Sequence, residues 1–286
     1  MNNIEVVIPA YNEEKTIAKV IQGIRKVLGD SCLVIVVDDA SEDTTAEIAR
    51  KQGARVISHP YHIGNGASVK SGLREARAEL VLLMDGDGQH LPEDLPGLLE
   101  KMPGFDMVIG ARNFSGYTLR NLANRLYNLF ASYVTQFKIL DLTSGFRLVK
   151  RNEALRFLYL LPNGFSYPTT LTLTFLKTGR TINYVSVSSG SRRAGRSKIR
   201  HFSDGIKFLL IITRISTLFS PLRVFLPVSI IFFLSGLFYY LYTFITTHRF
   251  TNMAVFLLSS SVIVFMLGLI SEQISQLRMD KTEDAP

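Results

Sequence analysis

Cysteine and tryptophan are almost missing from this chain of 286 residues, which has one cysteine and no tryptophan. The single Cys32 excludes an internal disulfide and a cysteine-rich metal site. Internal repeats and low-complexity segments are also absent. The first residues run straight into a predicted strand and do not resemble a secretory signal. We therefore expect the amino-terminal part to stay in the cytosol.

Acidic residues are outnumbered, with 24 Asp and Glu against 32 Lys and Arg and a formal net charge of +8. This charge favours an acidic partner: nucleic acid, a phosphorylated substrate or an anionic membrane. The basic stretch 190–201 lacks the interleaved aromatics typical of nucleic-acid binding, so we expect no nucleic-acid partner. It is either a patch held by anionic lipid or a clamp on phosphate.

Charge is nearly absent from two segments near the carboxyl end, 224–246 and 253–270. Each is long enough to cross a hydrocarbon core of ~30 Å, which predicts a transmembrane hairpin. Cations flank the pair on the outer sides, whereas Arg249 is the one full cation in the connection. The positive-inside rule then predicts a multi-pass protein of the inner cell membrane, with the first domain and both termini cytosolic. Two short spans are compatible with self-association into a homo-oligomer.

These patterns predict four parts. Residues 1–200 form a cytosolic domain, 201–222 an amphipathic helix in the membrane interface, 223–272 the two spans and 273–286 a cytosolic tail. In the first part, buried strands alternate with helices of ten to fifteen residues, which predicts an α/β domain with a mostly parallel, Rossmann-like sheet. The late strand 182–187 is expected at the edge of this sheet.

A strand-like run, 80–84, ends in Asp85-Gly86-Asp87-Gly88. Open α/β sheets bind ligands at the carboxyl ends of their strands. Two adjacent carboxylates repel one another unless a cation joins them, so a hard divalent metal is the natural partner. A solvated acidic turn is the alternative, because Asp and Gly are common in turns.

Several motifs in order resemble one family. The segments 7–14, 37–41 and 85–87 closely resemble the inverting GT-A-fold glycosyltransferases of family two. Gln89-His90, the segment 141–147 and the segment 193–198 narrow the resemblance to the polyprenyl-phosphate glycosyltransferases, the type of dolichyl-phosphate mannose synthase and of bacterial enzymes acting on undecaprenyl phosphate. The match covers roughly residues 4–200, and the predicted hairpin suits the bacterial type.

The resemblance implies a site for a UDP- or GDP-linked sugar. Residues of the first two motifs would hold the base and ribose: Pro9, Ala10, Tyr11, Glu13, Asp38 and Asp39. Carboxylates accept hydrogen bonds from ribose or ring N–H groups, and tyrosine offers an apolar face. Asp39 has an alternative role as a cap of the helix predicted at 41–50. Asp85, Asp87 and Gln89 would hold Mg²⁺ or Mn²⁺ against the diphosphate.

The resemblance also implies an acceptor side. Candidates for holding the acceptor phosphate are Arg112, Arg120, Arg125, Ser144 and Arg147. Arg193 and Lys198 would close over the donor phosphates. Asp87, Asp141 and Arg147 are the catalytic candidates, with Asp141 as an orienting group.

Two motifs of other family members are missing here, and their absence indicates which type of acceptor this chain uses. Processive members carry a Gln-x-x-Arg-Trp motif, which a chain without tryptophan lacks. Where other inverting members place a Glu-Asp base, this chain has Thr143-Ser144-Gly145. An alcohol acceptor needs such a base, whereas a lipid phosphate is already ionised. We expect transfer of one sugar to a polyprenyl phosphate. The alternatives are a transferase with a neutral lipid or protein acceptor and a non-catalytic nucleotide-binding membrane scaffold.

Overall fold

The computed structural model describes residues 4–29, 31–112, 119–164, 166–187, 210, 213, 216–217 and 220–283, and the side chains of these residues except 119–123 and 278–283. The chain forms two compact units, residues 1–208 and 209–286.

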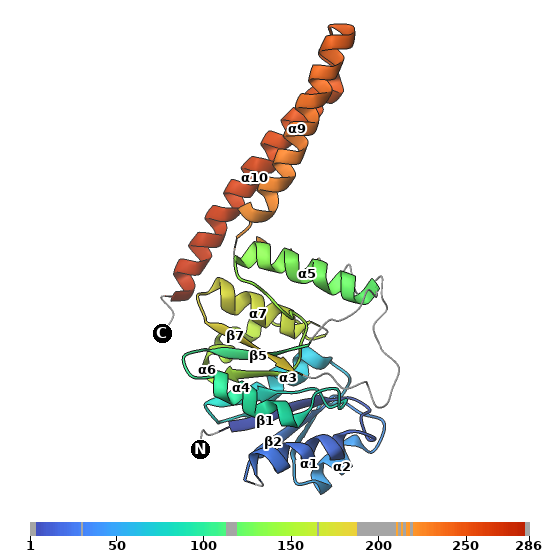
Figure 1. Cartoon of the computed structure of the whole chain (residues 1–286), viewed down its shortest axis with the longest axis vertical. Helices are drawn as coiled ribbons and strands as arrows, with labels where there is room; N and C mark the ends of the chain where they lie inside the picture. Colours follow the sequence, from blue (N-terminus) through green and yellow to red (C-terminus); the bar gives the residue numbers. More distant parts are fainter. Residues whose placement is uncertain are drawn as a thin grey trace. The chain divides into compact units, whose positions relative to one another are not determined.

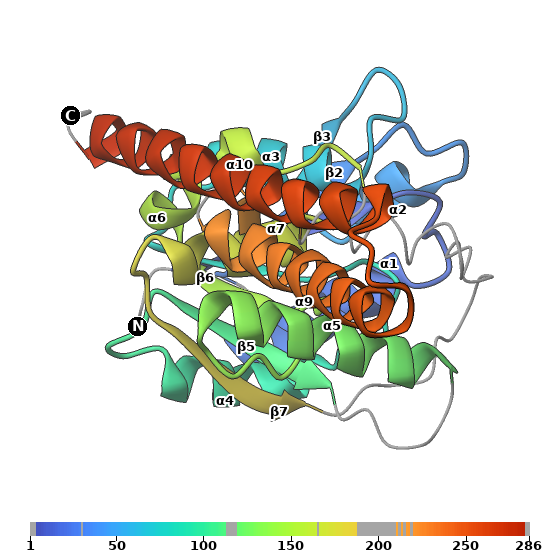
Figure 2. The same ribbon diagram turned by 90° about the horizontal axis from the view of Figure 1, so that it is seen from above.

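The first unit is built on a seven-stranded sheet with the order β3-β2-β1-β4-β6-β5-β7. The strands are β1 (Ile4–Ala10), β2 (Leu33–Asp38), β3 (Arg55–Ser58), β4 (Leu80–Leu83), β5 (Met107–Arg112), β6 (Arg147–Lys150) and β7 (Ile182–Val187). Only β6 runs antiparallel to its neighbours, β4 and β5. The expectation of a mostly parallel sheet is confirmed, and β7 lies at its edge beside β5 in both views (Figure 1, Figure 2).

Helices cover both faces of this sheet because its central strands are apolar on both sides. In β1, Val6 and Ile8 face one core while Val7 faces the other. The first core is closed by α1 (Ile17–Leu28), α2 (Thr45–Lys51) and α4 (Leu95–Lys101). The second is closed by α3 (Asn65–Glu75), α6 (Arg151–Arg156) and α7 (Tyr167–Lys177). The remaining helical elements of this unit are α5 (Leu119–Thr135) and the short 3₁₀ turns η1 (Pro92–Asp94) and η2 (Leu158–Leu160).

The strand register places the sequence motifs at one edge of the sheet. Ala10 pairs with Asp38, and Val7 pairs with Leu83, in parallel ladders. Parallel strands end on the same side, so the segments after β1, β2 and β4 emerge together. This is the edge at which open α/β sheets bind ligands.

The second unit is a pair of long helices, α9 (Leu222–Thr247) and α10 (Asn252–Glu283), which lie side by side (Figure 2). Both are long and apolar enough to cross a membrane, by length and composition. The segments predicted as spans lie inside them. Residues 273–283 of the predicted tail continue α10 as helix. Most of the interfacial helix predicted at 201–222 lies outside the described residues.

The two apolar helices meet along small residues spaced by seven. The buried positions are Ser229, Gly236 and Thr243 on α9 and Ala254, Ser261, Gly268 and Ser275 on α10. Ser229 Oγ donates a hydrogen bond to the Ser261 carbonyl at 2.9 Å. Small side chains let helix backbones approach closely where lipid removes the hydrophobic drive for association. The remaining surface of the pair is largely exposed and apolar, as lipid contact requires.

Candidate active site

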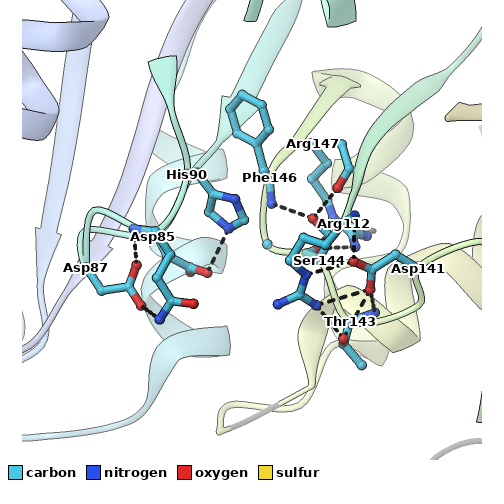
Figure 3. Close-up of polar contacts among 12 residues, drawn as sticks. Asp85, Asp87, His90, Arg112, Asp141, Thr143, Ser144, Phe146 and Arg147 are labelled. Atoms are coloured by element: carbon cyan, nitrogen blue, oxygen red, sulfur yellow. Dashed lines mark hydrogen bonds and ion pairs between the residues drawn. The ribbon is translucent and has the colours of Figure 1, made fainter. Parts of the chain in front are cut away.

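The turn after β4 is fixed by bonds to its own backbone and to α1. Asp87 accepts hydrogen bonds from the backbone and side-chain nitrogens of Gln89, at 3.0 and 2.7 Å. Thr16 Oγ1, at the start of α1, donates to the Gly86 carbonyl at 2.8 Å. Figure 3 shows Asp85 and Asp87 on this turn, facing a second cluster around Asp141. The solvated acidic turn is therefore the weaker interpretation of this motif.

Asp85 is held by two neighbours from the motifs around it. His90 Nε2 lies 3.7 Å from Asp85 Oδ2, and its ring stacks on Phe146 with centroids 5.3 Å apart. Gly145 passes so close that a Cβ there would overlap the Asp85 carboxylate. Burial acts to raise the pKa of Asp85, but His90 together with Asn65 and Arg112 outweighs it, so this pKa lies below its usual value. Asp85 is therefore an anion at neutral pH.

The acidic turn fits part of a divalent metal site. Among the described residues, no three His, Cys, Asp or Glu side chains gather as a complete ligand set. Asp85 Oδ1, however, is buried and has no hydrogen-bond partner in the described part of the chain. With Asp87 and the Gln89 amide oxygen it offers oxygen ligands of the kind that Mg²⁺ and Mn²⁺ prefer. An ion here would need further oxygen ligands from a bound substrate, and a diphosphate could supply them.

In the first motif, Pro9 and Ala10 end β1 as buried residues, and Tyr11 emerges at the edge. The Tyr11 ring packs against His62, with centroids 4.2 Å apart. Glu13 lies where α1 begins, and its backbone nitrogen donates to Thr45 Oγ1 at 2.8 Å. The structure thus brings the first motif beside the loop that precedes α3.

Asp39 ties β2 to that same loop. Its oxygens accept hydrogen bonds from the backbone nitrogens of Ile63 and Gly64, at 3.0 and 2.8 Å. They also contact His59 Nδ1 at 2.7 Å and His62 Nδ1 at 2.8 Å. Burial acts to raise the pKa of Asp39, but these partners outweigh it and hold the pKa below its usual value.

The contacts of Asp39 bear differently on its two predicted roles, capping of a helix and binding of the donor. It does not cap α2, because that helix begins at Thr45 and is preceded by Thr44. Donor binding by Asp39 stays a prediction, and a ligand would have to exchange with a group that already occupies the carboxylate. Asp38 is also buried, and its Oδ1 accepts from the Ser41 backbone nitrogen at 3.4 Å.

The second cluster joins the ends of β5 and the loop before β6. Arg112 donates from Nε to Asp141 Oδ2 at 2.8 Å and from Nη2 to Asp141 Oδ1 at 3.1 Å. It also reaches Thr143 Oγ1 at 2.7 Å. Burial acts to lower the pKa of Arg112, but Asp141 outweighs it and keeps the pKa above its usual value. Arg112 is thus a firmly positive group opposite Asp85 and Asp87 (Figure 3).

Two predicted phosphate ligands point into the protein. Ser144 Oγ is buried and donates to the Gly110 carbonyl at 2.6 Å. Arg147 is fully buried, and its guanidinium donates to the carbonyl of Ser144 and, at 3.0 Å, to that of Pro168. Because these groups are already bonded and inaccessible, the arrangement contradicts direct phosphate contact and a catalytic role for Arg147. Both residues instead brace the loop that carries Asp141.

The other predicted cations are less fully described. Arg125 lies on α5 with an exposed side chain, whereas the side chain of Arg120 on the same helix is outside the described residues. Arg193 and Lys198 also lie outside them.

Several residues around the site were not foreseen from the sequence. They are His59, His62, Thr16 and the stretch 166–169, which lines a pocket together with Asp85. A local signal existed for the two histidines, since His59-Pro60-Tyr61-His62 directly precedes the glycine-rich start of α3. Thr16 and the start of α7 carry no motif. They reach the site only through the folding of distant segments.

Two known family models match this chain. The model described as "Glycosyl transferase family 2" matches residues 5–155, and that described as "GtrB C-terminal hairpin" matches residues 220–277. The uncharacterized protein MJ1222 of Methanocaldococcus jannaschii is 33% identical over 51% of this chain, and the match spans 64% of that protein's length. The undecaprenyl-phosphate mannosyltransferase of Micrococcus luteus is 30% identical over 68% of this chain and 86% of that protein.

Among solved structures, glucosyl-3-phosphoglycerate synthase from Mycobacterium tuberculosis, in complex with Mn²⁺ and UDP-glucose, superposes with a TM-score of 0.60. It is 25% identical, and the match covers 75% of this chain and 79% of that one. The first model spans more than half of the chain and includes the Asp85–Asp87 turn. The chain therefore belongs to glycosyl transferase family 2, and it carries a carboxyl-terminal hairpin of the GtrB type.

Proposed function

We propose that this protein is an inverting glycosyltransferase that moves one sugar from a UDP- or GDP-linked donor to a polyprenyl phosphate and releases a lipid-linked monosaccharide. The observation that carries the proposal is the pairing of the acidic turn at Asp85 and Asp87 with the positive Arg112 across one site. One side suits a metal-bound diphosphate and the other suits an anionic acceptor. The apolar hairpin supports an acceptor that lies in a membrane.

Each side of the site has a defined task. Asp85, Asp87 and Gln89 would hold Mg²⁺ or Mn²⁺, which when bound neutralises charge on a leaving nucleoside diphosphate. Asp141 orients Arg112, and the guanidinium attracts and positions the acceptor phosphate. The phosphate oxygen attacks the anomeric carbon opposite the departing diphosphate, which inverts the configuration. Catalysis then rests on positioning and charge neutralisation.

The hydrogen bonds that occupy the Asp141 carboxylate support an acceptor that needs no catalytic base. Its carboxylate accepts three hydrogen bonds from Arg112 and further ones from Thr143, and its side chain is only 1% exposed. Both oxygens are occupied by these donors and buried, so Asp141 is not placed to take a proton from an alcohol acceptor. An alcohol acceptor requires proton removal, whereas a phosphate monoester reacts as the anion that it already is.

The hairpin implies a location as well. We infer that α9 and α10 anchor the enzyme in the cell membrane as a multi-pass protein, with the catalytic unit and both termini in the cytosol. The cations flanking the apolar segments support this orientation, because Arg249 is the one full cation in the connection between the spans.

The test is transfer by the purified full-length protein. It would be incubated with undecaprenyl phosphate, Mn²⁺ and a panel of UDP- and GDP-sugars, and lipid products would be identified by mass spectrometry. We expect one donor to yield a monosaccharide lipid that mild acid cleaves, and we expect chelation by EDTA to abolish its formation. Asp87→Asn should lower turnover at least ~100-fold, the scale at which loss of metal support acts. An acid-resistant product would indicate a neutral acceptor, and no product from any donor would refute the proposal.

A further inference from the structure

The partners of Asp39 differ in how firmly they are held. His59 contacts Asp39 Oδ1 through Nδ1 and Ser71 Oγ, on α3, through Nε2 at 2.9 Å, so both of its ring nitrogens are occupied. Its side chain is only 8% exposed. The other two partners on the loop before α3 are the backbone nitrogens of Ile63 and Gly64, which the course of the chain fixes. These three groups form a fixed frame around the carboxylate.

His62 differs from this frame because its side chain is 55% exposed. Its Nδ1 lies 2.8 Å from Asp39 Oδ2. Its ring also packs against Tyr11, with the centroids 4.2 Å apart and the planes tilted by 33°. The next residue, Ile63, holds the loop to Asp39 through its own backbone. The His62 side chain is therefore able to rotate towards solvent while the loop stays in place, and this rotation uncovers the carboxylate and the Tyr11 ring together.

The two contacts of His62 have the chemistry of contacts to a nucleobase. Uracil and guanine are planar rings that stack on an aromatic side chain, and each has a ring N–H that a carboxylate accepts. An imidazole is likewise planar and likewise carries an N–H. Tyr11 and Asp39 directly follow the paired ends of β1 and β2, at the edge of the sheet where ligands bind. The His62 ring thus covers the two groups that a base at this edge would use.

We propose that the His62 ring takes the place of the nucleotide base and competes with it, so that the donor binds after this side chain has rotated outward. The inference rests on the proposed function, because it takes the ligand to be a nucleotide sugar. It adds a residue that lowers the affinity for the donor and a conformational step that precedes donor binding.

The strength of the two contacts sets the size of the effect. Only the molecules in which His62 is turned outward accept the base, so the apparent affinity for the nucleotide is reduced in proportion to that fraction. A ring contact and one polar contact at a half-exposed side chain together correspond to about fivefold to tenfold in affinity. Removing the ring should restore this factor.

The test compares two exposed residues of the same loop. His62→Ala removes the ring from both contacts, and an exposed site tolerates this change with little loss of stability. Tyr61→Ala is the matched control, because it removes a neighbouring aromatic ring that is 66% exposed and makes none of the Asp39 contacts described above. Calorimetry with Mg²⁺ would measure the binding of UDP, GDP and inorganic diphosphate to the full-length wild type and to both variants.

We expect His62→Ala to bind its preferred nucleotide, UDP or GDP, about fivefold to tenfold more tightly than the wild type does. Its affinity for inorganic diphosphate should equal that of the wild type, because this ligand has no base to compete with the ring. Tyr61→Ala should match the wild type with all three ligands. The melting temperatures of the three proteins should agree, so that a general loosening of the fold is excluded as the cause.

The rotation itself is observable by NMR of the histidine-labelled protein. The His62 resonance is identified by its loss in His62→Ala, and the ring current of Tyr11 shifts it while the two rings are packed together. We expect this shift to disappear when Mg²⁺ and the preferred nucleotide are added. With Mg²⁺ and inorganic diphosphate the shift should persist.

Weaker nucleotide binding in His62→Ala would overturn the proposal, because His62 would then be a ligand of the base. Unchanged binding would overturn it as well, and so would an equal gain for inorganic diphosphate, an equal gain in Tyr61→Ala, or a His62 resonance that keeps its shift with nucleotide bound. Binding of neither UDP nor GDP by wild type and His62→Ala alike would also overturn it.

These outcomes are separate from the transfer assay. Transfer to undecaprenyl phosphate without a gain in nucleotide affinity in His62→Ala rejects the competition alone. A base-dependent gain in His62→Ala without any lipid product from the wild type rejects the proposed function alone.

Discussion

Arg112 and Asp141 form a bidentate ion pair in which Nε and Nη2 of the arginine meet the two carboxylate oxygens at 2.8 and 3.1 Å. The Asp141 side chain is 1% exposed and that of Arg112 is 17% exposed. The sequence motifs suggested that Arg112 binds the acceptor phosphate and that Asp141 is an orienting carboxylate. The geometry joins the two into one unit, in which Asp141 fixes the direction of the guanidinium.

Asp141→Asn should therefore damage the acceptor side selectively. Removing one member of a buried pair leaves the other charge uncompensated, so we expect the free energy of unfolding to fall by about 3 kcal/mol. The KM for undecaprenyl phosphate should rise because Arg112 is no longer held, while the affinity for the nucleoside diphosphate stays the same. Steady-state kinetics and calorimetry would measure these two quantities. An equal effect on donor and acceptor would show that the pair does not serve the acceptor.

Gly145→Ala should disturb the metal side. The added methyl group would overlap the Asp85 carboxylate and displace it from the position that His90 supports. We expect Mn²⁺ affinity in the presence of UDP to fall at least ~10-fold, in line with the loss of a supporting contact at a metal ligand. Gly164→Ala is the control, because a Cβ there meets nothing within 4 Å. Unchanged Mn²⁺ binding in Gly145→Ala would contradict the assignment of Asp85 as a metal ligand.

Asp39 should make part of the stability depend on pH. Its folded pKa is lowered, so its contribution is fully present above the unfolded value of about 3.9 and is lost as pH falls through the folded value. Asp39→Asn should be less stable than the wild type at pH 7, and the difference should shrink below about pH 4. Denaturant unfolding at several pH values would measure this.

The matched control for Asp39 is Glu100→Gln, which removes one acidic charge from a side chain that is 75% exposed. We expect this variant to follow the wild type at every pH. A stability difference between wild type and Asp39→Asn that persisted unchanged to pH 3 would contradict the assigned contacts of Asp39.

What the sequence determined by itself is whatever depends on local pattern. The apolar run before Asp85 forms a strand buried on both faces because its side chains have no polar side to expose. The two segments nearly free of charge become long apolar helices, since only a helix satisfies a backbone without water. The turn between Asp85 and Gly88 follows from its glycines and carboxylates, and the motif order predicted the family.

What only the tertiary structure decided is where each polar side chain points and what it meets. Arg147 stands in a motif that suggested phosphate binding, yet the packing of α7 turns its guanidinium towards backbone carbonyls. Asp39 receives its partners from a loop more than twenty residues away. Ser166 and Thr169 line a pocket together with Asp85, although they lie far from it in the sequence. A linear pattern records which groups are available, whereas hydrogen bonding and burial depend on three-dimensional packing that brings distant segments together.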